Sequence, residues 1–139
     1  MSEFGESAQN SLKHVFKIHK CEFVYLTGSY VRKEQFSWSD IDFVISYPSY
    51  QGLAPNDKLE YLFKITSAIS EVLSFDNIDL KIIETLPIHI QFSMVRDGKL
   101  IYQISEKKRT EFVENLLNVY YDHAIWYENY LDMTLSGEN

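Results

Sequence analysis

The chain has little of several things that would define its class. Among 139 residues there is one cysteine, Cys21, so no disulfide can form within the chain and no cysteine cluster can hold a structural zinc. Lysine and arginine number 13 against 20 aspartates and glutamates, a net charge of −7. Because nucleic-acid binding depends on basic side chains that neutralise phosphates, we expect no direct nucleic-acid substrate.

Long apolar runs are also missing. No stretch approaches the length needed to span a bilayer, and the amino terminus, MSEFGESAQN, lacks the basic-then-apolar layout of a secretory signal. We therefore expect a cytoplasmic protein without membrane contact. With 45% hydrophobic and 15% aromatic residues, the chain can bury the core of one domain without structural metal. These properties predict a single domain over residues 1–139.

Apolar spacing predicts helices interleaved with strands. β-branched and aromatic runs at 23–26, 41–46, 78–83 and 99–102 predict four strands. Helical periodicity predicts four helices, at 7–20, from the cap at Asn56 or Asp57 to 73, at 87–98, and at about 106–133, where the last helix closes the domain. This pattern indicates an α+β or α/β fold, and we expect a small mixed β-sheet flanked by helices that lie on one face.

Two aspartates stand at the start of an otherwise apolar strand. Asp40 and Asp42 are two residues apart, so their side chains project from the same face. Two carboxylates in this position repel each other unless a cation lies between them. Magnesium prefers oxygen ligands and is commonly held by one or two carboxylates together with substrate phosphates. The pair therefore predicts a Mg²⁺ site.

A third aspartate lies in a later strand. Asp79 is part of the run 78–83, and if that strand pairs beside the strand of Asp42, Asp79 can share the metal and take the proton from an attacking hydroxyl. Asp76 is the competing candidate. Because Asp76 stands in the polar turn 74–77, a solvated or capping role is the simpler interpretation for it.

Upstream of the carboxylates lies a corner suited to phosphate. Gly28 ends the first strand, and Ser29 offers a hydroxyl and an N–H group at the predicted start of a short helix, with Arg32 adding positive charge nearby. A phosphate-binding corner followed by paired carboxylates is what metal-assisted phosphoryl transfer requires. The alternative is a glycine turn and a polar loop that leads to solvated aspartates at the edge of a strand.

These residues resemble a known signature. Gly28-Ser29, the intervening loop, and then Asp40-Ile41-Asp42 are similar in type and spacing to the motif of the DNA polymerase β nucleotidyltransferase superfamily. The short length and the strand around Asp79 look more narrowly like the minimal nucleotidyltransferases. The resemblance implies a polymerase β-like fold, with Asp40, Asp42 and Asp79 as catalytic residues and metal ligands and with Gly28 and Ser29 at the triphosphate of ATP. Arg32 is added to the predicted ATP contacts because of its positive charge nearby.

The same resemblance carries an implied biology. Minimal nucleotidyltransferases commonly act as antitoxins beside a HEPN-domain ribonuclease toxin, which implies transfer of AMP from ATP to a toxin tyrosine and a hetero-oligomer with the toxin. Two alternatives stay open: a non-catalytic antitoxin that neutralises by binding alone, and a nucleotidyltransferase acting on a small-molecule hydroxyl. The last helix carries more aromatics than a single buried stripe needs, which favours a protein partner. These aromatics are Tyr120, Tyr121, Trp126, Tyr127 and Tyr130.

Overall fold

The computed structural model describes residues 4–28 and 40–135, with side chains described in the last helix up to residue 123 and at 128 and 129. The four predicted helices and four predicted strands are all present in this part of the chain. The helices are α1 (Glu6–Ile18), α3 (Pro55–Leu73), α4 (Ile88–Asp97) and α5 (Glu106–Leu135), and the strands are β1 (Phe23–Thr27), β2 (Ile41–Ser46), β3 (Ile78–Ile82) and β4 (Lys99–Gln103). Two short 3-10 helices, η1 (Pro48–Gly52) and η2 (Ile83–Thr85), connect them.

Helix α3 begins earlier than the sequence predicted. Its N-cap is Ala54 and its first residue is Pro55, so neither Asn56 nor Asp57 is the cap. Proline suits the first helical position because its missing N–H would have no partner inside the helix, and its fixed φ already matches a helix. The predicted end at Leu73 is correct, and the chain turns there through Ser74 in the left-handed region.

The sheet is mixed, as predicted, with the strand order β3-β2-β1-β4. β1 runs antiparallel to both β2 and β4, whereas β2 and β3 are parallel and are joined through α3. In this register Asp42 lies beside Thr27 on one side and beside Asp79 on the other. The two strands that carry the predicted carboxylates are therefore direct neighbours.

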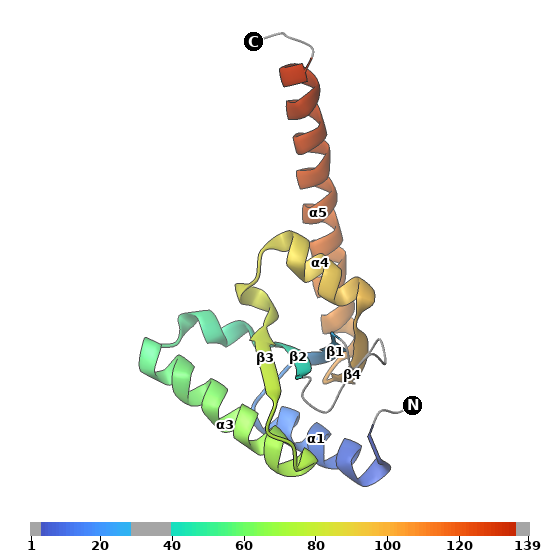
Figure 1. The fold of residues 1–139 in the computed structure, drawn as a ribbon. Coiled ribbons are helices and arrows are strands. Elements are labelled where there is room, and N and C mark those ends of the chain that lie inside the picture. Colours follow the sequence, from blue (N-terminus) through green and yellow to red (C-terminus); the bar gives the residue numbers. More distant parts are fainter. Residues whose placement is uncertain (1–3, 29–39, 136–139) are drawn as a thin grey trace.

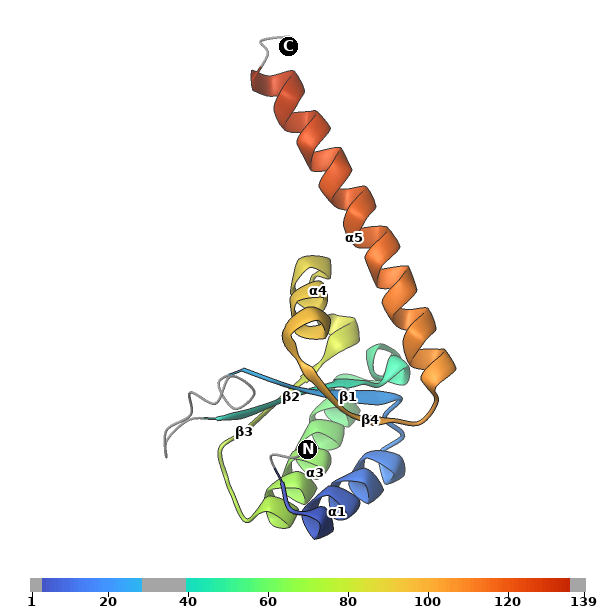
Figure 2. The same ribbon diagram turned by 90° about the vertical axis from the view of Figure 1, so that its right-hand side faces the viewer.

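Helices cover both faces of the sheet, so the expectation of a one-sided cover is wrong. α1 and α3 pack together on one face, and α4 with the first turns of α5 lies on the other (Figures 1 and 2). The physical reason is β1, whose five residues are all buried and therefore need cover on both sides. Val24 and Leu26 join the core under α1 and α3, whereas Phe23 and Tyr25 join the core under α4 and α5.

Side-chain alternation decides which face carries the aspartates. Phe43 and Ile45 of β2 point into the core under α1 and α3, and Val44 points to the opposite face. Asp42 shares its side of the strand with Val44 and therefore lies on the face that α4 covers. Cys21 is 2% exposed and belongs to the first core, as expected of a small buried residue.

Among its described side chains, helix α5 packs on the body through its first half. Leu116 is buried and Tyr120 stacks on Phe92 of α4, whereas Val119 and Tyr121 are exposed. Farther along, the helix projects away from the sheet and the other helices (Figures 1 and 2). Among the described residues, no helix is long and apolar enough to cross a membrane.

Candidate active site

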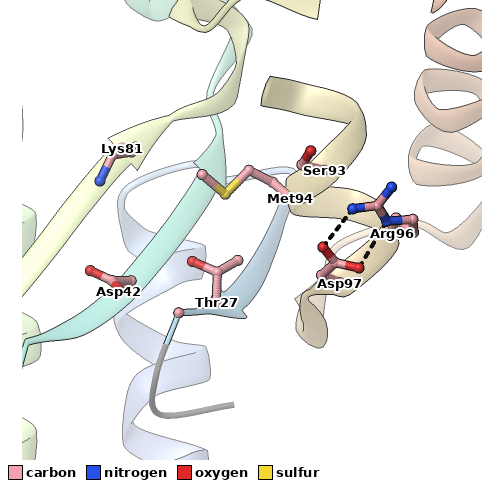
Figure 3. Close-up of a pocket in the computed structure, with 8 residues that line it drawn as sticks. Thr27, Asp42, Lys81, Ser93, Met94, Arg96 and Asp97 are labelled. Carbon is pink, nitrogen blue, oxygen red and sulfur yellow. Dashed lines mark hydrogen bonds and ion pairs between the residues drawn. The ribbon is translucent and has the colours of Figure 1, made fainter. Parts of the chain in front are cut away.

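A cavity of about 670 Å³ opens where the strands that carry the carboxylates meet α4. Strands β1, β2 and β3 form its floor and α4 forms one wall (Figure 3). Its lining combines both charge signs with small polar groups. The described lining residues are Thr27, Gly28, Asp42, Lys81, Ser93, Met94, Arg96 and Asp97.

Gly28 brings the backbone directly against the Asp42 carboxylate. Its φ is +79°, in the region that favours glycine, and a Cβ built on it would stand 2.0 Å from Asp42 Oδ2. A side chain at this position would therefore be both strained and in collision with the carboxylate. The backbone at the end of β1 therefore lies directly against Asp42.

Asp79 lies beside Asp42, as the sequence predicted for the case in which their strands pair. β3 runs parallel to β2, and Asp42 and Asp79 are register partners. The two carboxyl groups therefore lie side by side on the face that α4 covers. Neither Asp79 nor Asp76 is among the described residues that line the cavity, but Asp79 is the register partner of Asp42. Asp76, the competing candidate, is exposed in the turn before β3 and accepts a hydrogen bond from Ser70 Oγ at 3.2 Å.

The negative charges of Asp42 and Asp79 repel each other. Burial raises the pKa of the Asp42 carboxyl, and the negative charge of Asp79 raises that pKa further, whereas Lys81 lowers it. Lys81 stands two residues after Asp79 on the same face of β3, and its ammonium group donates to Asp79 Oδ2. A positive charge near these carboxylates is therefore already part of the fold.

Asp40 is exposed and stands immediately before β2. Its charge contributes to the raised pKa of Asp42, so it lies close enough to act on the pair. Even so, no three histidine, cysteine, aspartate or glutamate side chains in the described residues group into a metal site by themselves. The adjacent Asp42 and Asp79 still fit magnesium, because their oxygens are the ligands it prefers and substrate phosphates and water commonly complete its shell.

Two predicted ATP contacts cannot be placed. Ser29 and Arg32 lie in the stretch 29–39, outside the described residues. Of the predicted nucleotide-binding residues, Gly28 is the one that the structure places, at the rim of the cavity beside Asp42.

The wall formed by α4 was not foreseen. Ser93, Arg96 and Asp97 are spaced by three and one residues, so they share one side of the helix, and this polar spacing was the available signal. The Arg96 guanidinium donates to both oxygens of Asp97 at 2.8 and 2.9 Å and lies 5.4 Å from the centre of the Phe92 ring. Only the crossing of α4 over the sheet brings this side to the carboxylates.

The fold and this constellation match a known family. The polymerase beta, nucleotidyltransferase family matches residues 10–107, a span that includes Gly28, Asp40, Asp42 and Asp79. The chain belongs to this family.

Several solved structures have a similar fold. A toxin–antitoxin crystallised with AMP-PNP aligns with a TM-score of 0.68 at 17% identity, covering 91% of this chain and 98% of that one. The tri-AMPylated Shewanella oneidensis HEPN toxin in complex with MNT antitoxin aligns at 0.63 and 15%, covering 92% and 96%. The MntA–HepT toxin–antitoxin aligns at 0.62 and 17%, covering 94% and 99%. No curated protein matches the chain.

The approach of Gly28 to Asp42 yields a stability prediction. Gly28→Ala should lower the free energy of unfolding by about 1 kcal/mol or more, because alanine is strained at positive φ and its Cβ collides with the carboxylate. Gly52→Ala is the matched control, since a Cβ there meets nothing within 4 Å, and it should be neutral or stabilising. Urea unfolding of both variants measures the difference, and equal stabilities would contradict the geometry.

Proposed function

We propose that this nucleotidyltransferase-family protein is a magnesium-dependent protein adenylyltransferase and an antitoxin. It transfers AMP from ATP to a tyrosine hydroxyl of a partner HEPN-type ribonuclease toxin and neutralises it. The observation that carries the proposal is the in-register pair of Asp42 and Asp79 beside Gly28. In this proposal residues 1–139 form one minimal nucleotidyltransferase domain that works in the cytoplasm in complex with the toxin.

Each residue has a role that follows from its place. Asp40, Asp42 and Asp79 hold magnesium, which supplies charge neutralisation for the phosphates of ATP. Gly28 lets the backbone approach the nucleotide, and Ser29 and Arg32 contact its phosphates. Asp79 takes the proton as the acceptor oxygen bonds to the α-phosphorus of ATP, the bond from that phosphorus to the bridging oxygen breaks, and pyrophosphate leaves.

Three observations support a protein as the acceptor. The chain carries a net charge of −7, which disfavours a polynucleotide, and α5 extends beyond the body with Val119 and Tyr121 exposed where it leaves α4. The similar solved structures are toxin–antitoxin complexes, one of which contains an AMPylated HEPN toxin. An added AMP would place negative charge and bulk where RNA phosphates approach the toxin, which reduces cleavage by repulsion and obstruction.

The same projecting helix favours a second function, neutralisation by binding alone. A helix that offers exposed apolar side chains away from the catalytic cavity could cover a toxin without any chemistry. The two functions differ in whether the partner is modified.

Co-expression with a HEPN-type toxin that binds this protein separates the two functions. Intact-mass spectrometry should show one or more AMP additions on the toxin with the wild-type protein and none with the Asp40→Asn, Asp42→Asn double variant, which should also fail to neutralise. If the double variant fully neutralises an unmodified toxin, the protein acts by occlusion and the enzymatic proposal is wrong.

The two neighbouring aspartates before and in β3 provide a matched pair. Asp79→Asn should lower the AMP-transfer rate about 100-fold or more, because it removes the proton acceptor. Asp76→Asn should leave the rate near that of the wild type, since Asp76 precedes β3, is not a register partner of Asp42, and accepts a hydrogen bond from Ser70. Single-turnover transfer with radiolabelled ATP measures both, and the reverse ranking would show that the wrong carboxylate was assigned.

A further inference from the structure

The carboxylate proposed as proton acceptor is already engaged by a cation of the chain itself. Lys81 donates from its ammonium group to Asp79 Oδ2, and the two side chains are 40% and 42% exposed. Both project from β3 on the face that bears Asp42. In this arrangement the ammonium group lies where a divalent cation would have to bind.

A divalent cation and the Lys81 ammonium therefore compete for Asp79. An oxygen that accepts from an ammonium group has less electron density to offer a metal, and two cations at one carboxylate repel each other. The competition is a mild one, because ion pairs that are exposed to this degree are weakly held. Lys81 can thus be displaced without disturbing the core on the other face of β3.

The cavity offers the displaced ammonium group a new partner. Lys81 lines the same cavity as Gly28 and Asp42, where the proposed function places the phosphates of ATP (Figure 3). The second cation among the described lining residues, Arg96, is held by the two oxygens of Asp97 and by the Phe92 ring. Lysine carries its charge on a flexible stem and binds phosphate as a point charge, so Lys81 is suited to move.

We propose that Lys81 is a built-in counter-cation that exchanges partners during loading of the site. It neutralises Asp79 when no metal is bound, and it moves to the nucleotide phosphates when a divalent cation takes its place. This inference rests on the metal-binding and nucleotide-binding part of the proposed function and needs no acceptor.

Replacing Lys81 should change two affinities in opposite directions. Lys81→Met should tighten binding of Mn²⁺ or Mg²⁺ alone by about three- to fivefold, because the competing ion pair is gone. The same variant should weaken binding of AMP-PNP in saturating Mg²⁺ by about tenfold, because a charge-assisted contact to phosphate is lost. Isothermal titration calorimetry measures both affinities on the full chain.

Lys64→Met is the matched control. It also removes one positive charge and one ion pair, with Glu60 at 3.5 Å, but on the outer surface of α3, so both affinities should stay at the wild-type value. Lys81→Gln repeats the test with a polar side chain, and it decides the matter if Lys81→Met does not fold. Metal affinity that is unchanged or weaker in the Lys81 variants, or nucleotide affinity that is unchanged or tighter, would overturn the proposal. Because neither titration contains a toxin, failure of AMP transfer to a protein would leave this result standing.

Discussion

Two carboxylates held side by side on parallel strands are the constraint on which the site depends. Asp42 and Asp79 are register partners, and their mutual repulsion contributes to the raised pKa of Asp42. The apolar residues that alternate with them on the same strands offset this cost, since Phe43 and Ile82 are buried in the core under α1 and α3. Both faces of the sheet carry a hydrophobic core, and the two carboxylates stand on the face that α4 covers.

The residues around Asp42 and Asp79 make room for their carboxylates and supply a positive charge. Gly28 lets the backbone lie against Asp42 where any side chain would collide, and Lys81 supplies a positive charge from within the fold. Helix α4 forms a wall of the same cavity and contributes the hydrogen-bonded side chains of Arg96 and Asp97. One cavity thus brings together Gly28, Asp42 and Lys81, and Asp79 lies in register beside Asp42.

Much of the fold could be predicted from the sequence, because helices and strands follow from local patterns of apolar residues. Helical and strand periodicity predicted the four α-helices and four strands of the described residues, but not the two short 3-10 helices. That Asp40 and Asp42 share a face stays a prediction from their spacing. The two-sided cover was missed although the unbroken apolar run of β1 was its signal. The wall of α4 and the contact from Lys81 to Asp79 depend on how distant segments cross, which spacing alone does not determine. Ser29 and Arg32 lie outside the described residues, so their roles stay predictions.

The Asp42–Asp79 pair is expected to destabilise the protein without metal and to be stabilised by a bound cation and nucleotide. Thermal unfolding of the wild type and of the isosteric Asp42→Asn variant, which keeps the contact between Lys81 and Asp79, tests this most directly. Without metal the variant should melt higher, because repulsion is relieved. With Mg²⁺ and AMP-PNP the order should invert, because only the wild type gains the full stabilisation of binding. A variant that melts lower without metal, or that gains as much from the ligands as the wild type, would contradict the account.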